Sequence, residues 1–257
     1  MISAVIGVGG FLPVELSDYL SGFYSGVGTG LIVAAIITII RNIRTLKNEK
    51  LLKEKEIYEA GKMLGEIHRL SPVSNTYDLL TYDVYDFNEQ EVKESMEAII
   101  QYAKKAGVEV VTSLKTKLLE SVARQQELSE AGLPHVATPH DYKANNLVFI
   151  PEPYLIDPDN AAWIPRIFDL ALALLLFHNE HVDAPDRVFT TDEWELFLSG
   201  YKQSIVFTEQ EKLYWERAKQ HVFLDEVMWL MAEYEEDWQN PAQQTLFESL
   251  IRLVVDG

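Results

Sequence analysis

The sequence predicts a mainly α fold with a small β-hairpin, preceded by one transmembrane helix. Three observations support this prediction: an uncharged stretch from Tyr19 to Ile40, helical spacing of apolar residues over most of the chain after Ile57, and two short apolar runs on either side of Pro151 to Pro153. The 257 residues, 47% of them hydrophobic, can bury a sizeable core.

The charge is distributed unevenly along the chain. The formal net charge is −18, and residues 57–257 contain sixteen Lys and Arg against thirty-five Asp and Glu. Such a surface repels nucleic acid and favours cationic small molecules, so we expect a small-molecule partner and no nucleic acid. The chain has no cysteine, which excludes disulfides and thiolate metal sites.

The uncharged stretch is long enough to cross a membrane. As a helix, Tyr19 to Ile40 would measure about 33 Å, against a hydrocarbon core of about 30 Å. Lysines and arginines follow it, from Arg41 to Lys55, whereas Glu15 and Asp18 are the charges before it. The positive-inside rule then places residues 1–18 outside and the rest in the cytoplasm. A cleaved signal peptide is the alternative, but no basic region precedes the stretch.

The domain boundaries follow from this pattern. Residues 19–40 are the expected membrane span, 41–56 a charged helical linker, and 57–257 the folded domain. Within the span, small residues recur at four-residue intervals, which would let a second helix approach and form a homodimer. Glycine is also common in membrane helices for other reasons. The residues concerned are Gly22, Gly26 and Gly30.

Seven helices are expected in the folded domain from the spacing of apolar residues. Thr191 or Asp192 would cap the fifth of them, and Thr208 would cap the sixth, with Glu211 completing a capping box. The expected ranges are 57–70, 89–106, 111–131, 165–178, 192–202, 208–234 and 241–255.

Polar residues flank the expected hairpin. Asp141 and Asn146 precede its first strand, and Asp157 ends its second strand, which begins at Tyr154. A hairpin brings its two ends together, so these three side chains can converge. Carboxylate and amide oxygens suit Mg²⁺, and phosphoryl transfer needs such ligands together with a group that orients the attacking hydroxyl.

The same residues carry a family resemblance. Asp141-x-Lys143-x-x-Asn146 resembles the catalytic loop of protein kinases and aminoglycoside phosphotransferases, and Leu155-Ile156-Asp157 resembles their metal-binding strand. The stretch Arg166 to Ala171 resembles the start of the helix that follows in the phosphotransferases. The resemblance covers Ile57 to Gly257 and implies a protein-kinase-like carboxyl lobe.

The resemblance also implies roles for individual residues. Asp141 would be the catalytic base and Lys143 a phosphate-neutralising cation. Asn146 and Asp157 would be magnesium ligands, and Asp159 would assist the metal. The cofactors would be ATP and Mg²⁺, and the activity would be transfer of a phosphoryl group to a hydroxyl of a small molecule such as an aminoglycoside or aminocyclitol. Asp169, in the following helix, would brace the site.

The sequence departs from the family pattern in two places. Pro139 occupies the position where the family usually has histidine, and His140 stands directly beside Asp141. No amino-terminal nucleotide lobe is recognisable, and the cluster Gly7 to Gly10 lacks the Lys-Ser/Thr of a phosphate loop. The alternative function is therefore a catalytically inactive, membrane-tethered pseudokinase or a fused fragment.

Two further interpretations concern acidic residues and histidines. The stretch Tyr214 to Trp238 is rich in glutamate, Glu226 among them, and would either line a pocket for a cationic substrate or form a solvated helix face. His140 and Asp141 could also be the metal-binding pair of a helical phosphohydrolase, although Pro139 favours a loop there. Further ligands would then be His68, His135, Asp157 or His178. The five tryptophans are expected to pack in the core.

Overall fold

The computed structural model describes residues 53–150, 152–156, 158, 160–179, 181 and 184–256. The expected membrane span 19–40, with Gly22, Gly26 and Gly30, lies outside these residues. In the part of the chain that is described, no helix has the length and hydrophobicity needed to cross a membrane.

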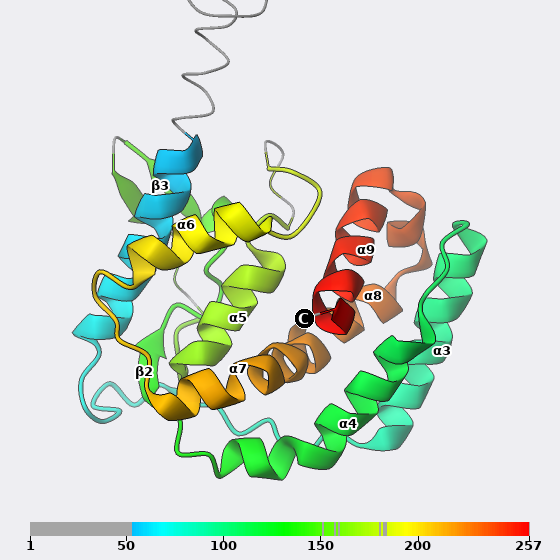
Figure 1. The fold of residues 1–257 in the computed structure, drawn as a ribbon, viewed down its shortest axis with the longest axis horizontal. Helices are drawn as coiled ribbons and strands as arrows, with labels where there is room; N and C mark the ends of the chain where they lie inside the picture. Colours follow the sequence, from blue (N-terminus) through cyan, green and yellow to red (C-terminus); the bar gives the residue numbers. More distant parts are fainter. Residues whose placement is uncertain are drawn as a thin grey trace, which may run out of the picture. The chain divides into compact units, whose positions relative to one another are not determined.

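Helices make up most of the described chain, as expected (Figure 1). Their positions agree with the apolar spacing to within a few residues. They are a helix over 53–70, α3 (Glu89–Lys105), α4 (Thr112–Ser129), α5 (Arg166–Leu176), α6 (Thr191–Tyr201), α7 (Glu209–Val222), α8 (Met228–Glu233) and α9 (Pro241–Asp256).

The expected single helix over 208–234 is interrupted. After α7 the chain forms a π-helical turn, η2 (Phe223–Val227), and then continues as α8. Such turns insert an extra residue into a helix and are frequent at functional sites. The chain leaves the helical conformation at Tyr234.

Capping side chains fix where the helices begin. The predicted capping box of Thr208 and Glu211 is confirmed at α7. The prediction for α6 is wrong by one or two residues, because its cap is Thr190: the Thr190 hydroxyl accepts the N–H of Glu193, and the Glu193 carboxylate accepts the N–H of Thr190.

The structure contains the expected hairpin and a second sheet that was not expected. The hairpin is β3 (Leu147–Phe149) paired antiparallel with β4 (Pro153–Leu155). In the second sheet the central strand β5 (Ala162–Pro165) pairs parallel with β1 (Leu80–Thr81) and antiparallel with β2 (His135–Thr138). Because β2 and β5 are antiparallel, the last residue of β2, Thr138, pairs with the first residue of β5, Ala162.

Helix α5 lies between two hydrophobic cores. One core gathers apolar residues of α3, α4, α7, α8 and α9, and the other gathers residues of helix 53–70 and α6. α5 contributes to both, and every residue from Ile167 to Leu175 is buried. A helix that is apolar on all sides belongs in the centre of a domain.

Helix 53–70 and α6 approach each other closely because glycines lie at the contact. A Cβ added to Gly200 would lie 2.1 Å from the carbonyl oxygen of Tyr58, and one added to Gly61 would lie 2.0 Å from that of Phe197. Backbone atoms cannot move aside cheaply, so any larger residue would push the helices apart.

We expect Gly200→Ala to lower the free energy of unfolding by about 2 kcal/mol or more, because overpacking outweighs the better helix propensity of alanine. Urea denaturation followed by circular dichroism measures this change. Gln101→Ala, on the exposed side of α3, is the control and should change stability by less than about 0.5 kcal/mol. Equal stability of Gly200→Ala and wild type would contradict the close contact.

Candidate active site

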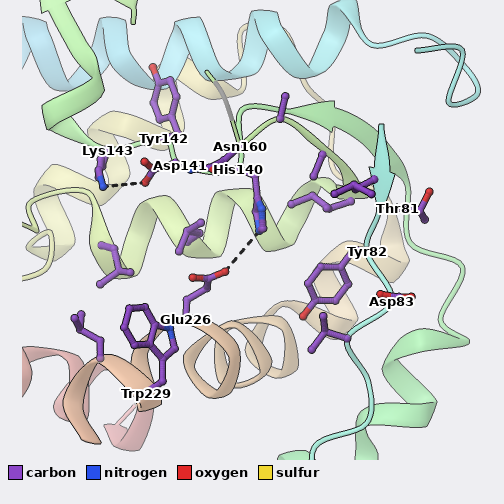
Figure 2. A pocket seen from close by; sticks show the side chains of 18 of the residues that line it. Thr81, Tyr82, Asp83, His140, Asp141, Tyr142, Lys143, Asn160, Glu226 and Trp229 are labelled. Atoms are coloured by element: carbon purple, nitrogen blue, oxygen red, sulfur yellow. Dashed lines mark ion pairs between the residues drawn. The ribbon is translucent and has the colours of Figure 1, made fainter. Parts of the chain in front are cut away.

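A cavity of about 620 Å³ lies beside the end of β2. Its walls come from the segment after β1, from the loop after β2, from α5 and from the turn between α7 and α8. Figure 2 shows His140 and Asp141 on one side, with Glu226 and Trp229 opposite them. Lys143 also lines this cavity, so two of the expected catalytic residues face the same open space.

The loop after β2 is held by Tyr142. This side chain is 1% exposed, and its hydroxyl donates to the carbonyl oxygen of Ala60 at 2.6 Å. The N–H of Ala144 donates to the carbonyl of Phe177, at the end of α5, at 2.8 Å. His140 adopts a left-handed conformation with φ 52°, which turns the chain out of β2. Asp141 is thus fixed on both sides.

Asp141 contacts both residues expected to act with it. The Nδ2 amide of Asn146 donates to Asp141 Oδ2 and to its backbone carbonyl, each at 2.9 Å. The Nζ of Lys143 lies 3.2 Å from Asp141 Oδ1. Since its amide nitrogen is engaged by Asp141, Asn146 would offer its Oδ1 atom to a metal.

The hairpin places Asn146 opposite the end of the second strand. The N–H of Ile156 donates to the carbonyl of Asn146 at 2.9 Å, one step beyond the last paired residues of β3 and β4. Asp157 follows Ile156 in the sequence, and both Asp157 and Asp159 lie outside the described residues. The convergence is therefore found for Asp141 and Asn146 and stays a prediction for the other two.

The opposite wall carries an acidic group. Glu226, in the π-helical turn, lies 3.7 Å from the Nε2 of His140. Burial raises the pKa of the Glu226 carboxyl, and the negative charges of Asp225 and Asp141 raise it further, while His140 lowers it. Of the two interpretations of the acidic stretch, the one in which it lines a pocket fits this residue.

Trp229 also belongs to this wall. Its side chain is 50% exposed and faces the cavity, so the expectation that all five tryptophans pack in the core is wrong for it (Figure 2). Trp229 follows the π-helical turn, near the start of α8, and lines the cavity there instead of the core. Trp238, in contrast, is fully buried.

Asp169 lies in the interior, as expected for a bracing residue. The Nε2 of His68 lies 3.0 Å from Asp169 Oδ2, and its Nδ1 lies 2.8 Å from the hydroxyl of Tyr201. A carboxylate oxygen accepts, so the Nε2–H of His68 donates to Asp169. Both partners of the His68–Asp169 pair have fully buried side chains. This network ties helix 53–70 to α5 and α6.

The histidines of the phosphohydrolase alternative have other partners. His68 is engaged as above, His135 Nδ1 bonds the carbonyl of Leu133, and His178 Nδ1 bonds that of Arg187. Among the residues that the structure describes, no three His, Asp or Glu side chains are grouped so as to hold a metal. The described geometry gives this alternative no support.

A model of the phosphotransferase enzyme family known as APH matches residues 17–205. This chain belongs to that family. The prediction of an aminoglycoside-phosphotransferase-type protein is thereby confirmed. The match begins before residue 19, so it also takes in the segment that the hydropathy pattern assigns to the membrane.

Among solved structures, this chain is similar to spectinomycin phosphotransferase in complex with ADP and spectinomycin. The similarity covers 78% of the chain at 16% sequence identity, with a TM-score of 0.41, and spans 64% of the other protein. No curated protein matches. The assignment to a family therefore depends on the match over residues 17–205.

We expect Asp169→Ala to lower the free energy of unfolding by about 3 kcal/mol, because it leaves a buried imidazole N–H without an acceptor. Tyr201→Phe, which removes one hydrogen bond, should cost about 1 kcal/mol. Asp86→Ala, an exposed aspartate, serves as the control in denaturant unfolding. If Asp169→Ala were as stable as this control, the buried network would have no bracing role.

Proposed function

We propose that this chain is an ATP-dependent phosphotransferase that acts on a hydroxyl group of a small cationic molecule, such as an aminoglycoside or aminocyclitol. Membership of the phosphotransferase family supports the reaction class. The observation that carries the proposal is Asp141, bonded to Asn146 and Lys143 at the wall of a cavity of about 620 Å³.

The proposed reaction needs one proton acceptor and one cation from the chain. The acceptor hydroxyl attacks the terminal phosphorus of ATP, the bond to the ADP oxygen breaks, and the hydroxyl proton passes to Asp141. Lys143, 3.2 Å from Asp141, neutralises negative charge that develops on the transferred group. Asn146 orients Asp141 through its amide nitrogen.

The donor set near Asp141 fits magnesium. Mg²⁺ prefers oxygen ligands, and Asn146 would contribute its amide oxygen while its nitrogen bonds Asp141. Asn146, Asp157 and Asp159 are the residues that we assign to the metal, the last two from the sequence. Bound Mg²⁺–ATP would supply the phosphoryl group and neutralise part of its charge.

A cationic acceptor fits the electrostatics of the cavity. The chain carries a net charge of −18, and Glu226 lies in the wall facing His140. Spectinomycin, which the similar phosphotransferase was crystallised with, is a reasonable first compound to test.

Asp141→Asn should reduce the turnover number at least a thousandfold, because the amide cannot accept the hydroxyl proton. Binding of Mg²⁺–ATP should change only a few-fold. ADP release with a panel of aminoglycosides and aminocyclitols measures turnover, and calorimetry measures nucleotide binding. Asp86→Asn, away from the cavity, is the charge-matched control.

The same measurements test the inactive alternative. A wild-type chain that binds no Mg²⁺–ATP and phosphorylates no compound of the panel would overturn the proposed activity. A membrane-tethered pseudokinase or fused fragment would then be the better description.

We also propose that residues 19–40 anchor the chain in a membrane, with the amino terminus outside and the catalytic-type domain in the cytoplasm. The uncharged stretch and the basic residues after it support this proposal. Gly22, Gly26 and Gly30 would form the contact of a homodimer.

Deleting residues 1–40 should move the chain from the membrane fraction to the supernatant after ultracentrifugation, because the apolar segment is lost. Deleting only residues 1–18 is the control and should leave the chain in the membrane fraction after carbonate washing. Recovery of the intact chain in the supernatant would contradict the anchor.

A further inference from the structure

The hairpin of β3 and β4 presents an apolar face to its surroundings. Val148 on β3 pairs with Tyr154 on β4, so their side chains lie on the same face. Ile150 and Ile156 follow at alternate positions and extend this face. The exposed fraction of these four side chains ranges from 36% for Val148 to 69% for Ile150. The four residues together are called the outer face of the hairpin.

The opposite face of the hairpin belongs to a hydrophobic core. Leu147 is buried in this core, and Phe149 and Leu155 pack against it. A sheet with one face in a core and the other in water normally alternates apolar with polar residues. This hairpin is apolar on both faces, and Glu152, in its turn, is the only charged residue in the sequence from 147 to 156. The outer face therefore has the composition of a surface that an apolar partner covers.

The hairpin lies beside the helix with which the described chain begins. Ile57, in the first turns of helix 53–70, packs against the same core as Phe149 (Figure 1). The expected membrane span ends at Ile40, thirteen positions before Lys53. Thirteen residues reach at most about 45 Å when extended and about 20 Å as a helix. The linker would therefore keep the start of helix 53–70 within that distance of the end of the span.

The charge of the linker favours an approach to lipid. Residues 41–55 contain six Lys and Arg against two Asp and Glu, whereas the whole chain has a net charge of −18. Lys53 and Lys55, at the start of helix 53–70, have exposed side chains. Basic residues next to a membrane span are attracted to anionic lipid headgroups. This attraction would bring the start of the helix, and with it the hairpin, to the lipid surface.

We propose that the outer face of the hairpin lies in the interfacial layer of the membrane that residues 19–40 span. This inference rests on the proposed membrane anchor and does not depend on phosphoryl transfer. The ring and hydroxyl of Tyr154 suit the level of the lipid headgroups. Ile150, next to the turn, would enter the boundary between headgroups and acyl chains. Apolar side chains buried about 5–10 Å deep at this boundary are removed from water.

Lipid is favoured over a second copy of the chain as the occupant of the outer face. Two copies that each have a net charge of −18 repel one another, whereas the linker holds each hairpin near the bilayer at a high effective concentration. The contact would also orient the candidate site. The N–H of Ile156 donates to the carbonyl of Asn146, so a hairpin held at the lipid surface would set the position of Asn146 relative to the membrane.

The inference is tested with the full chain reconstituted in liposomes of phosphatidylcholine and phosphatidylglycerol. Since the chain has no cysteine, Ile150→Cys provides a single site for the polarity-sensitive fluorophore NBD. Lipids that carry a nitroxide close to the headgroup should quench about half or more of its emission, because the label lies at the depth of the quencher. Circular dichroism checks that the labelled chain keeps its helical content.

Val206→Cys, labelled in the same way, is the matched control. Val206 is also apolar, is 87% exposed, and lies between α6 and α7, outside the outer face. Its label should lose little emission. Tyr154→Asp, added to the Ile150 variant, should remove most of the quenching, because a charged group resists transfer out of water. The chain should still resist carbonate washing, since this change leaves the span intact.

The outcomes separate this inference from the proposed anchor. A carbonate-resistant chain whose Ile150 label is quenched no more than the Val206 label would overturn the lipid contact and leave the anchor intact. Quenching that persists with Tyr154→Asp would also overturn it, because the linker alone would then explain the proximity. Excimer emission from a pyrene label at Ile150 would identify a second copy as the occupant and overturn lipid. Release of the chain by carbonate together with an unquenched label would overturn both proposals.

Discussion

The hydroxyl of Tyr142, bonded to the carbonyl of Ala60 at 2.6 Å, is the interaction on which the site depends. Tyr142 stands between Asp141 and Lys143, so its burial decides where both polar side chains point. Burial also raises the pKa of this hydroxyl well above its usual value, with the charge of Asp169 adding to the rise. The hydroxyl is therefore a donor at every relevant pH, and a residue of the hydrophobic core fixes the loop that carries Asp141.

The same constraint links the loop to the rest of the domain. The loop is bonded to the end of α5 through Ala144, and α5 contributes to both hydrophobic cores. Asp169, in the middle of α5, ties it to helix 53–70 through His68. The close approach of that helix to α6 at Gly61 and Gly200 completes the support. Hydrogen bonds and close helix packing thus both support the wall of the cavity that carries Asp141.

Much of this half of the site could be predicted from the sequence because its determinants are local. Asp141 and Asn146 are five residues apart on one side of a hairpin, and a hairpin is visible from its apolar runs and prolines. Most helices could be predicted because they are long enough to show their period, whereas the six-residue α8 was expected as the end of one helix over 208–234. Strands β1, β2 and β5 have two to four residues each, too few for an alternating pattern. The predicted cap of α6, Thr191 or Asp192, is wrong because Thr190, Thr191 and Asp192 stand in a row and each has a side-chain oxygen that can cap a helix.

The other half of the cavity has determinants that are not local. Glu226 faces the cavity because a π-helical turn interrupts a pattern that reads as one continuous helix, and the spacing of apolar residues does not reveal an extra residue. The turn is fixed by Tyr82 and His221, which are 139 positions apart in the sequence. Aromatic and histidine residues at such separation carry no local signal. The residues of the wall that carries Asp141 can thus be recognised in one short stretch of sequence, whereas the wall that carries Glu226 depends on contacts between segments more than a hundred residues apart.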